Sequence, residues 1–124
     1  VSPRKVGASL VAQYYKVLIE NREGLHRFYK ADSRFQHTYE GYPKGHSSVV
    51  RGVDAIREHV AALDLEDLSI NLENATLDCQ ASFNGGILVS VTGLLSTHKR
   101  SYRAFVQTFF LAPQLLAGQG SFYL

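Results

Sequence analysis

The sequence predicts one α+β domain in which helices come first and a long antiparallel meander of strands follows. Apolar residues recur at helical spacing in the first part of the chain and at alternate positions from Leu68 onward. This order contains no strand–helix–strand units, which favours an α+β domain over a parallel α/β one. The chain has 124 residues, of which 45% are hydrophobic. That is enough for one core, and we expect a single domain over residues 1–124.

Three helical segments are predicted before the meander. The first has Ser2 as its N-cap and Pro3 at its first position, and it ends at Asn21. A short second helix is expected over Glu23 to Tyr29, and a third over Val53 to Leu63. The first helix carries one broad apolar stripe, which consists of Val6, Leu10, Val11, Tyr14, Tyr15 and Leu18.

Short strands are predicted on both sides of a loop in the middle of the chain. The first spans Arg34 to Tyr39, the loop covers Glu40 to Ser48, and the second is the brief strand Val49-Val50. In the meander, Leu68, Ile70 and Leu72 alternate with polar residues, whereas Ala75, Leu77 and Cys79 continue in the opposite phase. The change of phase predicts a bulge or bend near Asn74.

The last part of the chain is expected to form two long strands and the start of another. Asn84-Gly85-Gly86 is typical of a hairpin turn. Strands then follow over Ile87 to Ser96 and Tyr102 to Leu111. Pro113 to Gly120 is predicted to be a loop, and Ser121 to Leu124 to begin a further strand.

Both faces of the strand over Tyr102 to Leu111 are apolar. One face shows Tyr102, Ala104, Val106 and Phe110, and the other shows Phe105, Phe109 and Leu111. A sheet with one solvated face would alternate apolar and polar residues cleanly. Because the helices can cover only one face, we expect a second copy of the chain to cover the other. A bent sheet that wraps its own edge is the alternative.

Composition excludes several classes of function. Cys79 is the only cysteine, so neither an internal disulfide nor a cysteine-based zinc cluster can form, which is typical of a reducing compartment. The net charge of +2 arises from scattered Lys and Arg, which gives no case for direct nucleic-acid binding. No apolar run approaches the ~20 residues of a membrane span, and the first residues are not typical of a signal peptide.

Few residues are suited to acid–base catalysis. The strand over Ile87 to Ser96 has no ionisable side chain, and His37 is the strongest single candidate because it shares a face with Phe35 and Tyr39. Asp78 lacks a partner carboxylate, and His26 and His59 lie on predicted helices. No histidine pair has metal-ligand spacing. We therefore expect no catalysis, cofactor or metal.

Short blocks along the whole chain resemble the N-terminal domain of the Ras GTPase-activating-protein-binding proteins, which are stress-granule scaffolds. That domain has the nuclear transport factor 2-like fold, a cone of three N-terminal helices packed on a strongly bent antiparallel sheet. The middle of the chain matches only in pattern, which indicates a divergent member. The resemblance also implies that the last strand is truncated at Leu124. The matching blocks are Val6-Gly7, Tyr14-Tyr15, Leu25 to Tyr29, Gly93 to Ser96, Phe105 to Phe109 and Leu111 to Pro113.

The resemblance implies a homodimer that binds short Phe-containing peptides of the Phe-Gly-Asp-Phe or Phe-x-Phe-Gly type. Implied partners are caprin-like proteins, ubiquitin-specific proteases and nucleoporin repeats, with RNA bound only by regions outside this chain. The implied location is the cytoplasm and stress granules, with the nucleus or nuclear envelope as a second one. Leu10 stands where the family usually has Phe, which removes an aromatic wall from the groove. The peptide-binding positions carried over are Val6, Leu10, Arg27, Phe28 and Phe122.

Two other functions remain open for this fold. One is a small-molecule isomerase or dehydratase with an acid or base inside the cone, for which His37 is the candidate. The other is a nuclear transport carrier for the GTPase Ran. The turn expected to grip Ran should be acidic, whereas here it is Thr97-His98-Lys99-Arg100. Like charges across an interface disfavour association, and so this turn disfavours the carrier.

Overall fold

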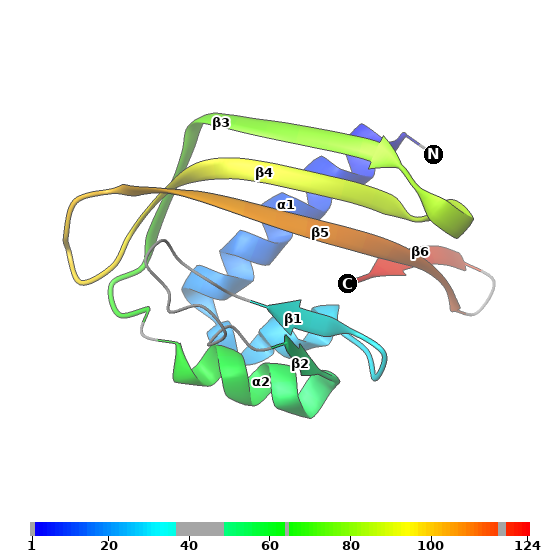
Figure 1. Ribbon diagram of the computed structural model, residues 1–124, viewed down its shortest axis with the longest axis horizontal. Helices are drawn as coiled ribbons and strands as arrows, with labels where there is room; N and C mark the ends of the chain where they lie inside the picture. The colour runs from blue at the N-terminus through cyan, green and yellow to red at the C-terminus, as the bar shows by residue number, and fades with distance from the viewer. Residues whose placement is uncertain (1, 37–48, 64, 117–118) are drawn as a thin grey trace.

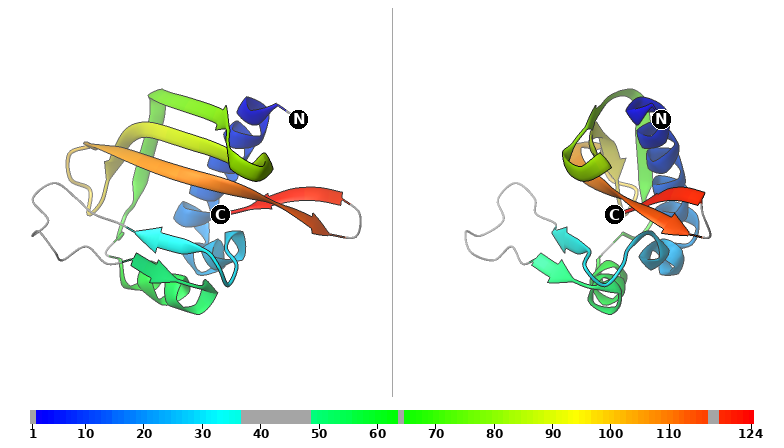
Figure 2. Two further views of the ribbon diagram at one scale, coloured as in Figure 1. Left: turned by 45° about the vertical axis from the view of Figure 1, so that its right-hand side comes forward. Right: turned by 90° about the vertical axis from the view of Figure 1, so that its right-hand side faces the viewer.

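A four-stranded antiparallel sheet, ordered β3-β4-β5-β6, carries helix α1 on one face (Figure 1). The end-on view of Figure 2 shows β4 on one side and α1 on the other, with β6 passing across the view in front of the helix. The computed structural model describes residues 2–36, 49–63, 65–116 and 119–124. The elements are α1 (Pro3–Glu20), the 3-10 segment η1 (Arg22–Phe28), β1 (Arg34–Gln36), β2 (Val49–Arg51), α2 (Val53–Ala62), β3 (Ser69–Ala81), the 3-10 segment η2 (Phe83–Gly85), β4 (Ile87–Ser96), β5 (Arg103–Leu116) and β6 (Gln119–Tyr123).

Helix α1 forms as the sequence predicts. The Ser2 hydroxyl accepts a hydrogen bond from the backbone N–H of Lys5, and Pro3 begins the helix where no N–H is needed. Gly7 faces β3 so closely that a Cβ there would overlap the Sγ of Cys79. Absence of a side chain at this position lets the helix lie directly on the sheet.

The core lies between α1 and the inner face of the sheet. The sheet contributes the inward-facing, alternate residues of β4 and β5 to the core, and α1 contributes its apolar stripe. The helix α2 and η1 close the lower end, and β1 and β2 pair beside them as a two-stranded sheet. The buried hydrophobic residues are Val11, Tyr14, Tyr15, Leu25, Tyr29, Ile56, Val60, Ile87, Val89, Val91, Phe109 and Leu111.

The sheet is bent at β3, where the sequence predicts a bulge. The pairing passes from Asn71 opposite Leu94 to Thr76 opposite Thr92. Between these two pairs β3 advances by five positions while β4 advances by two. Figure 1 shows β3 turning sharply along its length. Extra residues in one strand of a pair bend that strand and reverse which side chains face the core. The prediction of a bulge near Asn74 is therefore confirmed.

The loop predicted over Pro113 to Gly120 is wrong for most of its length. β5 continues to Leu116 and pairs with β6, with Pro113 opposite Phe122. The ladder between β4 and β5 ends at Ile87 opposite Leu111. Pro113 therefore lies beyond β4, where β5 has a paired neighbour on one side only. A proline that lacks the N–H donor is tolerated in such an edge position.

The other sequence-based elements are confirmed with shifted ends. The second helix is a 3-10 segment that runs from Arg22 to Phe28. Of the strand predicted over Arg34 to Tyr39, β1 covers Arg34–Gln36, and His37 and Tyr39 lie outside the described residues. The hairpin turn is confirmed, because the N–H of Ser82 donates to the carbonyl of Gly86 across it.

Candidate functional site

An open groove of about 370 Å³ lies between α1 and the end of the sheet. Helix α1 supplies two neighbouring rows of side chains at a spacing of four residues, which places each row on one face of the helix. Val6 and Leu10 form the inner, half-buried row, and the outer row is exposed. The opposite wall comes from the sheet. The lining residues are Lys5, Val6, Ser9, Leu10, Gln13, Leu111 and Phe122.

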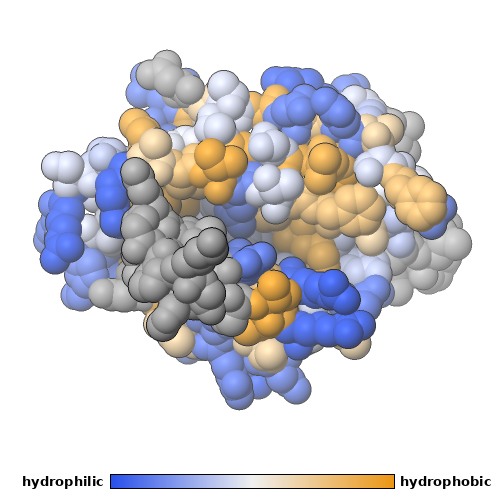
Figure 3. All heavy atoms as spheres, viewed as in Figure 1, coloured by the Kyte–Doolittle hydropathy of each residue, from blue (hydrophilic) through white to orange (hydrophobic). Residues whose placement is uncertain are grey.

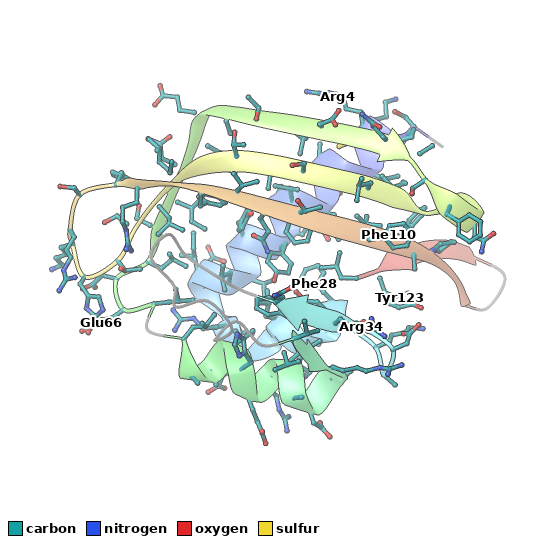
Figure 4. The ribbon with its side chains drawn as sticks, in the orientation of Figure 1. Arg4, Phe28, Arg34, Glu66, Phe110 and Tyr123 are labelled. Atoms are coloured by element: carbon teal, nitrogen blue, oxygen red, sulfur yellow. The ribbon has the colours of Figure 1, made fainter. Side chains whose placement is uncertain are left out.

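The structure brings three of the five predicted peptide-binding residues together. Val6, Leu10 and Phe122 line the groove, whereas Arg27 and Phe28 are not among its lining residues. Phe28 is half-buried beside Tyr14, at 5.3 Å between ring centroids, and its carbonyl accepts a hydrogen bond from the N–H of Leu124. Figure 4 shows Phe28 inside the molecule below β5. Its ring therefore supports the core, and its backbone carbonyl anchors the end of β6.

Four lining residues were not predicted from the sequence. Lys5, Ser9 and Gln13 follow one another at intervals of four on α1. This spacing beside Val6 and Leu10 is a signal that the sequence contains, because such rows adjoin on a helix. Leu111 joins the groove only through the packing of β5 under α1, and no local pattern indicates that contact.

A second feature is an apolar patch on the outer face of the sheet, turned away from α1. We define the outer patch as Leu88, Leu94, Val106 and Phe110, whose side chains all face outward from β4 and β5. Val106 is 71% exposed and Phe110 45% exposed. Figure 3 shows hydrophobic side chains gathered over these two strands, and Figure 4 shows Phe110 in front of them. The doubly apolar strand predicted from the sequence is thus present.

The outer patch is also hollowed beside the bulge of β3. A depression of about 370 Å³ lies there, and Leu94 and Val106 are among its lining residues. On β3 the outward positions are polar, and Thr76 and Thr92 share a hydrogen bond of 2.6 Å between their hydroxyl oxygens. The patch is therefore bounded by a polar strand on the β3 side. An apolar surface with a polar rim is typical of interaction sites.

Buried tyrosines form a hydrogen-bonded cluster between α1 and the sheet. The hydroxyls of Tyr14 and Tyr29 are 2.6 Å apart, and the hydroxyl of Tyr15 donates to Oε1 of Gln107 at 2.5 Å. Burial raises the pKa of Tyr14 to about 12, and hydrogen bonds to Tyr29 and Gln107 partly offset it. Burial, followed by the charge of Tyr14, raises the pKa of Tyr15 and Tyr29 further. The cluster is neutral and structural, and Tyr14 and Tyr15 belong to the apolar stripe predicted for the first helix.

We expect these three tyrosines to ionise late in an alkaline titration. The pKa values of these tyrosines are raised above the ordinary 10. The contribution of their protonated hydroxyls to the free energy of unfolding is therefore complete below pH 10. It is lost as the pH rises through the folded-state pKa values, about 12 for Tyr14. Phenolate absorbance and circular dichroism, followed together, should show late ionisation that coincides with unfolding. In Tyr29→Phe, the late phase should shrink by one tyrosine. Ionisation of all seven tyrosines near pH 10 in a still-folded protein would contradict the cluster.

Of the residues considered for catalysis, the three that the structure describes form no common site. His37 lies outside the described residues. Asp78, which the sequence left open as an inward-facing residue, is exposed on the outer face and accepts a hydrogen bond from Gln80. The Nδ1 of His26 is 2.6 Å from the carbonyl oxygen of Glu23, and the ring of His59 packs against Phe35.

Over residues 2–36, 49–63, 65–116 and 119–124, no group of three or more His, Cys, Asp or Glu side chains is placed to hold a metal ion. Among the helices in those same ranges, none combines the length and the apolar character that crossing a bilayer requires.

Comparison with known proteins gives a consistent family match. The model of the nuclear transport factor 2 (NTF2) domain matches residues 6–124. The chain is 37% identical over 109 residues to a nuclear transport factor 2 of Arabidopsis thaliana. It is 34% identical over 110 residues to a putative G3BP-like protein of Schizosaccharomyces pombe. These matches cover 88% and 89% of the chain but 23% and 24% of the relatives. The chain therefore spans about a quarter of the length of these two relatives.

Solved structures agree with the fold. Nuclear transport factor 2 from Cryptosporidium parvum superposes with a TM-score of 0.76 at 25% identity, covering 98% of this chain and 89% of that one. A chain of the complex of the yeast deubiquitinase Ubp3 with its cofactor Bre5 superposes with a TM-score of 0.71 at 20% identity. That match covers 99% of this chain and 93% of the other, and it shows the same fold. The predicted α+β cone is confirmed.

Proposed function

The chain belongs to the nuclear transport factor 2 domain family, and we propose that it is a protein-interaction domain that holds short Phe-containing peptides in the groove between α1 and β6. The observation that carries this proposal is the half-buried apolar row of Val6 and Leu10 facing Phe122 across an open groove. The 34% identity to a putative G3BP-like protein supports the proposal as well. G3BP-like proteins belong to the Ras GTPase-activating-protein-binding proteins, which the short sequence blocks also resemble.

The groove suits an aromatic anchor for physical reasons. A peptide Phe ring removes a large apolar area from water when it inserts between aliphatic side chains. Its contact with the ring of Phe122 adds about 0.5–1.5 kcal/mol. A short peptide gains little else and loses backbone entropy when it becomes ordered. Micromolar affinity is therefore the expectation.

Leu10 sets the width of the groove. The family resembled by this sequence usually has Phe at that position, and Leu leaves a shorter wall opposite Phe122. Because the groove is open along one side, a ring placed at Leu10 has room to turn toward solvent. We therefore propose that Leu10→Phe strengthens binding of a Phe-Gly-Asp-Phe peptide.

Isothermal titration of a Phe-Gly-Asp-Phe peptide tests the groove. Phe122→Ala should weaken binding at least about tenfold, because it removes the ring contact and part of the apolar wall. Leu10→Phe should strengthen it. Ala12→Ser, on an exposed position of α1 that is not among the lining residues of the groove, is the matched control and should leave affinity unchanged. Equal affinities of the wild type and Phe122→Ala would place the binding site elsewhere.

The outer patch supports a second part of the proposal, a homodimer formed face to face across the sheet. From Leu88 to Leu94 and from Ala104 to Phe110, the outward residues carry no charge. A symmetric pair would bury the patch on both copies without leaving an open edge for further growth.

The proposed domain is an adaptor and not an enzyme. Its partners would be proteins with Phe motifs, such as caprin-like proteins, ubiquitin-specific proteases or nucleoporins. The proposed location is the cytoplasm and stress granules, with the nucleus or nuclear envelope as a second one. RNA would be bound by other parts of the full protein.

Transport of Ran is the alternative, because two of the similar proteins reported above are named nuclear transport factor 2. The turn between β4 and β5 disfavours it, since Lys99 and Arg100 are exposed there.

A further inference from the structure

We infer that Lys5 makes the groove selective for peptides that carry a carboxylate beside their aromatic anchor, an inference that rests on the peptide-binding function proposed above. In the structure, one cationic side chain lies beside the apolar site proposed for the aromatic anchor. Lys5 lines the groove next to Val6, in the first turn of α1. All the other lining residues are uncharged.

The cation is available to a ligand. No ion pair joins Lys5 to a carboxylate in the described parts of the chain, and the first turn of α1 contains no acidic residue. The neighbouring Arg4 is engaged elsewhere, because its guanidinium donates to the carbonyl of Leu77 at 3.0 Å. Figure 4 shows Arg4 beside β3. Lys5 is thus the basic side chain that the groove presents to a peptide.

The wall formed by β6 does not cancel this charge. Asp32 is the carboxylate that contacts β6, where it accepts a hydrogen bond of 2.9 Å from the hydroxyl of Tyr123. Successive side chains of a strand point to opposite faces, so Tyr123 and Asp32 lie on the face opposite Phe122. The ammonium of Lys30 lies 5.0 Å from the ring centroid of Tyr123, on that same side. The groove side of β6 therefore carries no described acid that could repel a peptide carboxylate.

Arg27 is the competing candidate, because the family resemblance places it at the rim of the groove. It belongs to η1 and is not among the lining residues. Lys5 and Arg27 carry the same charge on exposed side chains of similar length. They are therefore matched variants for an experiment that separates the two positions.

Binding of two peptides, Phe-Gly-Asp-Phe and Phe-Gly-Asn-Phe, decides the assignment. The wild type should prefer the Asp peptide by about two- to fivefold at low salt, the range of an exposed ion pair, and less at high salt. Lys5→Gln should abolish this preference and still bind both peptides, whereas Arg27→Gln should retain it. Lys5→Glu should prefer Phe-Gly-Lys-Phe over the Asp peptide.

The outcomes separate the inference from the function on which it rests. Equal binding of both peptides by the wild type, or a preference that survives Lys5→Gln, overturns the role of Lys5 while the groove stands. If only Arg27→Gln loses the preference, Arg27 is the residue that selects the carboxylate, and the role of Lys5 is overturned. If neither peptide binds the wild type, the proposed function fails and the inference fails with it.

Discussion

Val106→Glu should convert a dimer of twice 13.8 kDa into a monomer of 13.8 kDa in sedimentation equilibrium at micromolar concentration. Val106 is the most exposed residue of the outer patch, so Glu at this position remains solvated in a single copy and the fold is preserved. In a face-to-face dimer the same carboxylate would be buried without a partner. The cost of an unpaired buried charge is several kcal/mol, and a symmetric interface would bury one such charge from each copy.

Two controls make the dimer prediction specific. Ala12→Glu adds the same charge on an exposed position of α1 and should leave the mass at twice 13.8 kDa. Circular dichroism of Val106→Glu should match that of the wild type, which separates dissociation from unfolding. A wild type that sediments as a monomer refutes the dimer, and a Val106→Glu protein that remains dimeric places the interface on another surface.

Most of the fold could be predicted because local patterns determine it. The cap formed by Ser2 and Pro3, the reversal of apolar phase around Asn74 and the Asn84–Gly86 turn each involve residues that are close in sequence. The wrong loop over Pro113 to Gly120 has the opposite cause. Proline and glycine usually indicate loops, but here β5 extends past the end of β4, where a missing N–H donor costs little.

The groove was predictable only in part, because its two walls come from distant segments. Val6 and Leu10 belong to a helical stripe visible in the sequence, and the row of Lys5, Ser9 and Gln13 could have been found by the same spacing. Leu111 enters only through tertiary packing. The role of Phe28 depends on which side of η1 its ring faces, and a 3-10 segment with three residues per turn orients side chains differently from an α-helix.

Phe28→Ala should cost about 3 kcal/mol of the free energy of unfolding, the lower end of the range for truncated core phenylalanines. The lower end applies because the ring is half-buried, beside Tyr14 at 5.3 Å between centroids. Urea unfolding measures this loss.

Phe28→Leu keeps most of the volume of the side chain, so this variant should stay folded and allow peptide binding to be measured. We expect its affinity for Phe-Gly-Asp-Phe to fall far less than that of Phe122→Ala, whose side chain lines the groove. A stable Phe28→Leu protein that no longer binds peptide would make Phe28 a wall of the site. A Phe28→Ala protein as stable as the wild type would show that the ring adds little to the core.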